Sequence, residues 1–369
     1  KDARVKPASE RSETEIGILM SAPSETVTIE NCHISGSIIG SGNAYFAGGL
    51  IGHVRQSANV KIELCSADVR ITGTAGNGFA GGLIGYIDGT AEINNSYAVV
   101  DMDVDYINYA GGLVGAGNNA EISNSYAAGK SLTGKWAGGT VSGIANNGTI
   151  TNSISIFPEM TSVNRISQGG TLSGNYGFVG TTARNSTGKV LTPEESNIGP
   201  DQIYGADASA DQLRSQKFYQ STLGWDFENV WTMPSAESGY KFPVLKGQKE
   251  SMIPTLSLDM DPKVISVSLD QQQATIYPKG SLKLTATVES KNGASRDVKW
   301  VSSDLSAVHV TDDGTVAVHK DAAAGTYTVT AVSQFDKSKQ AYSEITVDNS
   351  EHTVNIVREN TTNSPDAEI

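Results

Sequence analysis

Short apolar segments recur between residues 16 and 182, and glycine and small polar residues separate them. One unit contains Phe79-Ala80-Gly81-Gly82-Leu83-Ile84-Gly85, followed by Ile93-Asn94-Asn95-Ser96-Tyr97-Ala98. The segments are rich in β-branched residues, and no apolar stripe with the 3.6-residue helical period runs through them. The pattern predicts short β-strands that are joined by tight turns.

The unit repeats with a period of about 30 residues. Its glycine motif begins at Phe46, Phe79, Tyr109 and Trp136, at intervals of 33, 30 and 27 residues. Weaker copies on both sides bring the number of units to about six. A propeller blade needs about 40 residues, whereas three short strands with their turns fit this period. We therefore expect an all-β fold with a parallel, right-handed β-helix solenoid over residues 16–182.

Equivalent residues of successive coils lie directly above one another in a parallel β-helix, so the second motif predicts three ladders. One is aliphatic and interior, one consists of small side chains at a corner, and one consists of asparagines at a turn, because asparagine tolerates left-handed backbone. Their members are Ile29, Ile62, Ile93, Ile122 and Ile150; Cys32, Cys65, Ser96, Ser125 and Ser153; and Asn31, Asn95, Asn124 and Asn152, with Leu64 as an interruption. The Gly-Gly pairs are expected to supply positive φ at another corner.

Cys32 and Cys65 are the two cysteines of the chain, and both fall on the ladder of small side chains. We expect free, buried thiols, because a bridge between neighbours in a parallel ladder demands unfavourable dihedral angles. A disulfide is the alternative. Two cysteines form neither a disulfide framework nor a cysteine-based zinc site.

The pattern changes after residue 182. Ser209-Ala210-Asp211-Gln212 has the spacing of a capping box, and residues 208–221 are predicted to form one helix. Aromatic residues then cluster, with Trp225 and Trp231 close together. Because a β-helix ends in an open coil that must be covered, we interpret residues 183–250 as a C-terminal cap. A ligand site is the alternative.

Residues 254–348 show the alternation of apolar and polar positions that is typical of a β-sandwich. The turn signals Asn292-Gly293 and Asp312-Asp313-Gly314 separate the expected strands. Residues 1–15 are predicted to be a flexible N-terminal segment, and residues 349–369 a polar, disordered tail.

Composition and charge exclude several functions. The formal net charge of −13 argues against nucleic acid as a partner, because phosphate contacts need clustered Lys and Arg. No apolar run approaches the ~20 residues of a membrane helix. The sequence has neither an H-E-x-x-H nor a G-x-S-x-G motif, so we expect a protein that is not an enzyme.

Two resemblances add to this reading. The pattern Ala-Gly-Gly-Leu-(Ile/Val)-Gly, followed by Ile-x-Asn-Ser-Tyr-Ala, resembles the GLUG repeat of large bacterial surface proteins, such as IgA-cleaving metallopeptidases and filamentous-haemagglutinin-type adhesins. The segment from Val298-Lys299-Trp300 to Gly325-Thr326-Tyr327 is similar to the group 2 bacterial Ig-like domain, with Trp300 as its core tryptophan. The resemblance to the GLUG repeat implies an extracellular or cell-surface location.

Aromatic residues share repeat positions and are the first candidates for a binding site. Phe46, Phe79, Tyr109 and Trp136 are expected to stack along one face, and Tyr97 and Tyr126 form a second, shorter stack. Stacked rings stabilise a fold by themselves, which is the structural interpretation. The functional interpretation is a platform for carbohydrate, because flat aromatic faces suit sugar rings.

Asp101, Asp103 and Asp105 alternate along one expected strand, so their carboxylates lie on one face. Such an oxygen cluster suits calcium, and a solvated acidic face is the alternative. A calcium cluster beside a basic residue would also fit a polysaccharide-lyase site, for which Arg55 and Arg70 are candidates by elimination. We expect no other cofactor.

These features predict a non-enzymatic, adhesin-like bacterial surface or secreted protein. Its β-helix would present a binding face to a host surface protein or a carbohydrate, and the Ig-like domain would act as a spacer. We expect a monomer without membrane insertion in this stretch. The alternatives are an accessory, non-catalytic region of a larger secreted enzyme and a plain stalk.

Overall fold

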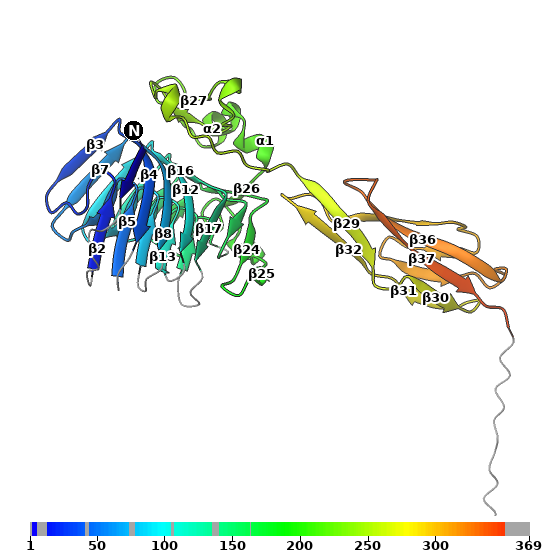
Figure 1. Cartoon of the computed structure of the whole chain (residues 1–369). Coiled ribbons are helices and arrows are strands. Elements are labelled where there is room, and N and C mark those ends of the chain that lie inside the picture. Colours follow the sequence, from blue (N-terminus) through cyan, green and yellow to red (C-terminus); the bar gives the residue numbers. More distant parts are fainter. Residues whose placement is uncertain are drawn as a thin grey trace, which may run out of the picture. The chain divides into compact units, whose positions relative to one another are not determined.

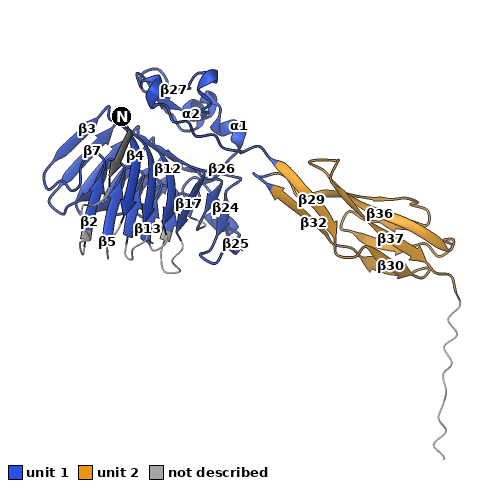
Figure 2. Cartoon of the chain, in the orientation of Figure 1, with its two compact units in different colours: residues 1–262, 291–293 blue, residues 263–290, 294–369 orange. Residues whose placement is uncertain are grey.

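The computed structural model describes residues 2–5, 13–40, 44–73, 78–104, 107–134, 140–162 and 164–350. The chain forms two compact units (Figure 2). The first reaches residue 262 and includes residues 291–293, and the second takes the rest of the described chain. Residues 254–262, which the sequence assigned to the sandwich, thus belong to the first unit.

The first unit contains a parallel β-solenoid, as predicted (Figure 1). A complete coil has four strands rather than three, and the strands of successive coils form four sheets, here numbered I to IV. Sheet I consists of β2 (Glu13–Gly17), β5 (Ala44–Gly48), β9 (Gly78–Gly81), β13 (Ile107–Gly111) and β18 (Thr140–Ser142); sheet II of β6 (Ile51–Val54), β10 (Ile84–Ile87) and β14 (Val114–Ala116). Sheet III consists of β3 (Val27–Glu30), β7 (Asn59–Glu63), β11 (Thr90–Asn94), β15 (Ala120–Ser123), β19 (Thr149–Thr151) and β22 (Thr171–Ser173).

Sheet IV is the widest sheet and contains one long strand or two shorter strands of each coil. Its members are β1 (Asp2–Val5), β4 (His33–Gly40), β8 (Ser66–Gly73), β12 (Tyr97–Val104), β16 (Tyr126–Ala128), β17 (Ser131–Gly134), β20 (Ile154–Ile156), β21 (Glu159–Met160), β23 (Tyr176–Phe178), β24 (Thr182–Arg184), β25 (Val190–Leu191) and β26 (Ala206–Ala208). Since β26 pairs with β23, the solenoid continues beyond residue 182, where the sequence placed its end.

The predicted isoleucine ladder lies in sheet III. Ile29, Ile62, Ile93, Ile122 and Ile150 are register partners on neighbouring strands, and all five are buried. Leu172 continues the ladder into the next coil. Each step buries one aliphatic side chain against the next, which contributes roughly 1.5–3 kcal/mol per residue.

The corner after sheet III carries the other two predicted ladders. Its first residue has left-handed backbone in every case, with φ between 45° and 55° at Asn31, Leu64, Asn95, Asn124 and Asn152. The small side chain that follows binds the preceding coil: Ser96 Oγ accepts from the Cys65 N–H (3.0 Å) and donates to the Asn94 carbonyl (2.8 Å). Ser125 and Ser153 repeat this geometry. The ladder of small residues thus supplies hydrogen bonds that join the coils.

Cys65 occupies the same corner as a free, buried thiol, whereas Cys32 is free and half-buried. The Cys32 N–H donates to Cys65 Sγ (3.4 Å), and this thiol donates to the Glu63 carbonyl (3.1 Å). Cys65 therefore replaces a serine of the ladder.

The Gly-Gly pairs serve a different purpose from the one predicted. The Gly-Gly residues of the first three motifs do not have positive φ; that conformation occurs at other glycines of the described chain. A Cβ on Gly81 would lie 2.0 Å from the Ile84 carbonyl oxygen, and a Cβ on Gly82 would lie 2.2 Å from the Gly112 carbonyl oxygen of the next coil. Glycine is required because the backbones approach closely, not because φ is positive.

The fourth glycine motif is four residues out of register with the structure. Tyr109 pairs with Thr140, and Gly111 pairs with Ser142, so the fourth equivalent of Tyr109 is Thr140 and not Trp136. The interval from Tyr109 is then 31 residues, close to the earlier two. Trp136 itself lies outside the described residues.

A buried arginine fixes the last coil. The Arg165 guanidinium donates to the carbonyl groups of Tyr204 (2.9 Å), Phe178 (2.9 Å) and Gly205 (3.2 Å), and it forms an ion pair with Asp207 (2.7 Å). Its side chain is 7% exposed. One cation thus satisfies several carbonyl groups where the chain leaves the solenoid.

The segment after β26 covers the side of the solenoid rather than its end (Figure 1). Its aromatic residues pack on Tyr97, Tyr126 and Ile154 of sheet IV. The segment comprises α1 (Ala210–Leu213), α2 (Gln216–Thr222), β27 (Trp231–Thr232), β28 (Val244–Leu245), and 3-10 turns at Ala236–Ser238 and Glu250–Met252; another such turn, Glu195–Asn197, precedes β26. We call residues 209–258 the lateral cover.

The predicted helix is interrupted. The capping box is present, since Ser209 and Gln212 bond each other's backbone N–H. Ser215 then adopts extended backbone (φ −108°, ψ 118°), which separates α1 from α2. The Tyr219 hydroxyl donates to the Leu213 carbonyl at the end of α1, so the second helix folds back onto the first.

The second unit is a β-sandwich. Its strands are β29 (Lys263–Leu269), β30 (Gln273–Ile276), β31 (Ser281–Lys283), β32 (Ala286–Lys291), β33 (Val298–Ser302), β34 (Val308–Val310), β35 (Thr315–Val318), β36 (Gly325–Ser333) and β37 (Gln340–Val347). One sheet has the order β30-β37-β36-β33 and another β31-β35-β34. Trp300 packs in the core between them with Val316 and Ile345, as predicted for the core tryptophan.

Candidate functional site

Five rings form a continuous array on the outer face of sheets I and II, which we call the aromatic strip. Phe46, Phe79 and Tyr109 are register partners in sheet I. Successive side chains of a strand point to opposite faces. Since the next residues along each strand, Ala47, Ala80 and Ala110, are buried in the interior, the three rings point outward. His53 and Tyr86 are partners in sheet II and stand beside the first two rings.

The rings of the strip are in mutual contact. Centroids are 5.4 Å apart for Phe46 and Phe79, and 5.6 Å apart for Phe79 and Tyr109. Within a coil the separation is 4.7 Å, both for Phe46 with His53 and for Phe79 with Tyr86. These contacts, roughly 0.5–1.5 kcal/mol per pair, hold the side chains in one arrangement before any ligand arrives.

Tyr109 is the most accessible ring. It is 36% exposed, and its register partner in the next coil is Thr140. Within the described part of the chain, no further ring follows Tyr109 in this column. Tyr109 is therefore the ring of the strip with the largest exposed fraction for contact with a ligand.

Charged groups border the N-terminal end of the strip. His53 Nδ1 lies 2.9 Å from Glu15 Oε1, and His53 Nε2 lies 2.9 Å from Asp88 Oδ2. Both ring nitrogens of His53 are therefore in contact with a carboxylate. Arg55 also donates to Glu15 (2.9 Å), so this end of the strip offers several polar groups to a ligand.

Two pKa shifts reflect this border. Burial raises the pKa of Glu15, but the hydrogen bonds from Arg55 and His53 outweigh burial, and the net shift is downward. Burial and the hydrogen bond with the Asp88 carboxylate raise the pKa of Tyr86. Glu15 therefore stays ionised, and Tyr86 stays a neutral hydroxyl, over the neutral pH range.

Tyr97 and Tyr126 form the second predicted stack, with centroids 4.9 Å apart and planes at 2°. Both side chains are fully buried beneath the lateral cover. The Tyr126 hydroxyl lies 2.8 Å from the Tyr240 hydroxyl and donates to the Pro243 carbonyl (2.7 Å). These two rings therefore anchor the cover and are closed to a ligand.

The acidic motif lies partly within the described residues. Asp101 and Asp103 are exposed on one face of β12, as the alternation predicted, and Asp105 lies outside the described residues. Asp101 Oδ2 is 3.7 Å from Arg70 Nε. Among the described residues, no group of three or more acidic, His or Cys side chains is placed to hold a metal ion.

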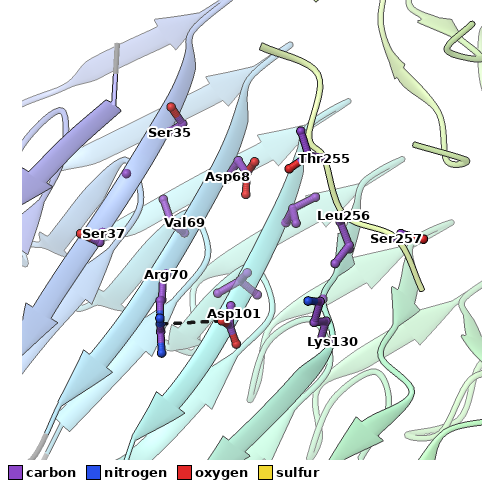
Figure 3. A pocket seen from close by; sticks show the side chains of 14 residues that line it. Ser35, Ser37, Asp68, Val69, Arg70, Asp101, Lys130, Thr255, Leu256 and Ser257 are labelled. Atoms are coloured by element: carbon purple, nitrogen blue, oxygen red, sulfur yellow. Dashed lines mark ion pairs between the residues drawn. The ribbon is translucent and has the colours of Figure 1, made fainter. Parts of the chain in front are cut away.

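Asp101 and Arg70 line a groove on the outer face of sheet IV, which we call the flank groove (Figure 3). Its volume is about 670 Å³. Strands β4, β8 and β12 form the floor, and Thr255, Leu256 and Ser257 of the lateral cover form a wall. The sequence did not predict this groove, because residues more than 100 positions apart build it.

His53 and Tyr86 are the members of the strip that sequence reasoning missed. They follow Phe46 and Phe79 by seven residues in each case, so the same repeat contains a second aromatic position. That spacing was a readable signal. It was hidden because the third copy has Ala116 at this position.

Comparisons with known proteins identify one part of the chain. Residues 263–345 match the family model of the bacterial Ig-like domain (group 2), and such domains occur in bacterial surface proteins. No GLUG-repeat family was found in the solenoid, and no curated protein matches the chain. The molecule is thus a β-solenoid that carries a bacterial Ig-like domain. No helix of the described chain has the length and apolarity needed to cross a membrane.

Proposed function

We propose that this chain is an extracellular, adhesin-like bacterial surface protein that binds glycans through the aromatic strip. The observation that carries the proposal is the in-register column Phe46, Phe79 and Tyr109, which faces solvent and ends in an accessible ring. The chain acts by binding rather than by catalysis, as a monomer, and the Ig-like domain serves as a spacer.

The chemistry of the strip suits a sugar. The C–H face of a pyranose packs on an aromatic ring, and its hydroxyls pair with charged groups at the ring's edge. Tyr109 supplies the ring for one sugar unit, and the polar border at Glu15, Arg55 and Asp88 supplies partners for other units of an oligosaccharide at the opposite end of the column. Because the rings are already held by one another, binding orders few side chains, which favours affinity.

A glycan array tests the proposal directly. We expect the full chain to bind at least one glycan class, and Tyr109→Ala to weaken that binding about two- to tenfold, the equivalent of one aromatic contact. Tyr342→Ala is the matched control, because Tyr342 is an exposed tyrosine (60%) of the second unit. Equal affinity in wild type and Tyr109→Ala, or an array without any bound glycan, would contradict the proposal.

A further inference from the structure

The flank groove is a site separate from the aromatic strip. It lies on sheet IV, whereas the strip lies on sheets I and II. Its volume of about 670 Å³ falls within the roughly 300–1,000 Å³ of small-molecule sites. The floor is regular, since Ser37, Arg70 and Asp101 are register partners on three neighbouring strands. Such a floor holds its side chains at fixed spacing.

Charges of opposite sign alternate in the groove. Asp68 and Arg70 project from the same strand two residues apart, and Asp101 follows Arg70 on the next strand. The Arg70–Asp101 ion pair is long, at 3.7 Å, and both side chains are more than half exposed. A pair of this kind contributes little by itself, so both groups retain hydrogen-bonding capacity for a ligand.

Lys130 completes the charge balance. It lines the groove beside Asp101, and within the described residues it forms no ion pair. Two carboxylates, Asp68 and Asp101, then face two cations, Arg70 and Lys130. The groove carries no net charge, although it is rich in charged donors and acceptors.

This arrangement selects one class of ligand. An anion or a cation meets as much repulsion as attraction, whereas a hydroxyl both donates and accepts and can pair with either sign. Leu256 of the lateral cover adds apolar surface for the C–H groups of a sugar ring. We infer that the flank groove binds an uncharged oligosaccharide, with Asp101, Arg70 and Lys130 as its polar anchors.

Titration of the full chain with defined sugars tests this inference. The probes are three uncharged tetrasaccharides (cellotetraose, mannotetraose and N-acetylchitotetraose) and the anionic tetragalacturonate. We expect at least one uncharged probe to bind, and tetragalacturonate to bind more weakly. Asp101→Asn should weaken binding of the uncharged ligand about tenfold, because it removes a charged acceptor. The same variant should strengthen binding of tetragalacturonate, because it removes a negative charge.

Asp103→Asn is the control, because Asp103 lies on the same face of β12 but outside the groove lining. Every titration is repeated in Tyr109→Ala, which should leave groove binding unchanged. The inference fails if no uncharged probe binds, if tetragalacturonate binds more tightly than all of them, or if Asp101→Asn behaves as Asp103→Asn does. A sugar that is lost in Tyr109→Ala but retained in Asp101→Asn belongs to the aromatic strip alone.

Discussion

At the scale of single residues, the corner after sheet III shows how backbone conformation selects side chains. Left-handed backbone costs most residues roughly 1–2 kcal/mol, and asparagine less. Leu64 adopts this conformation (φ 55°) and packs against the apolar cluster beneath the lateral cover. Partial burial of the leucine side chain against this cluster offsets the strain, which explains the one interruption of the asparagine ladder.

Substitutions at Asn95 test whether backbone conformation or side-chain hydrogen bonding determines the stability of this corner. We expect Asn95→Val to lower the free energy of unfolding by about 1–2 kcal/mol, because a β-branched residue resists positive φ. Asn95→Gly should be close to neutral. Urea denaturation of both variants provides the measurement. A similar loss in the glycine variant would show that the amide group, and not the backbone, is what the corner needs.

At the scale of elements, the polar border of the strip ties three coils together. Glu15 lies in β2, His53 in β6, and Asp88 directly follows β10. The hydrogen bonds from Arg55 and His53 are made to an ionised Glu15. Their contribution should therefore depend on pH.

The sign of that dependence follows from the lowered pKa of Glu15. A carboxyl whose pKa is lower in the folded state stabilises the protein above its ordinary pKa of 4.5, and this stabilisation is lost as pH falls through the folded pKa. We expect Glu15→Gln to lower the melting temperature at pH 7 and to have little effect near pH 3. A constant difference across this range would exclude the ionic contribution.

Some features of these elements could be predicted from the sequence, and others could not. The isoleucine ladder and the left-handed asparagines were predictable, because one repeat position meets one environment in every coil. The register of the fourth motif was not, because Trp136-Ala137-Gly138-Gly139 matches locally while backbone pairing places Thr140 opposite Tyr109. The burial of Tyr97 and Tyr126 was also hidden, since it depends on Trp231 and Tyr240, more than 100 residues away.

At the scale of the whole molecule, the two units have separate cores. Arg165 closes the last coil of the first unit, and Trp300 packs in the core of the second. We expect calorimetry to resolve two unfolding transitions. Arg165→Met should lower the melting temperature of one transition, because it leaves buried carbonyl groups without donors, which costs roughly 1–3 kcal/mol per group. Trp300→Ala should lower the melting temperature of the other transition, because the loss of a core tryptophan costs roughly 3–5 kcal/mol.

The assignment of transitions depends on selectivity. Each variant should leave the transition of the other, unmutated unit at its wild-type temperature. If either variant shifted both transitions together, the units would unfold as one cooperative body, and the division of the chain into two units would not describe its energetics.

The corner hydrogen bonds have a consequence for how such a protein changes in length. Each coil meets the next through the same contacts, Ser96 to Cys65 and Ser125 to Ser96, so an inserted coil finds matching partners on both sides. A duplication of one unit of about 30 residues would lengthen the solenoid by about 4.8 Å and add a further row of rings to the strip. The length of the aromatic strip is therefore set in whole steps by the number of coils, and genetic duplication can adjust it without redesign of any corner.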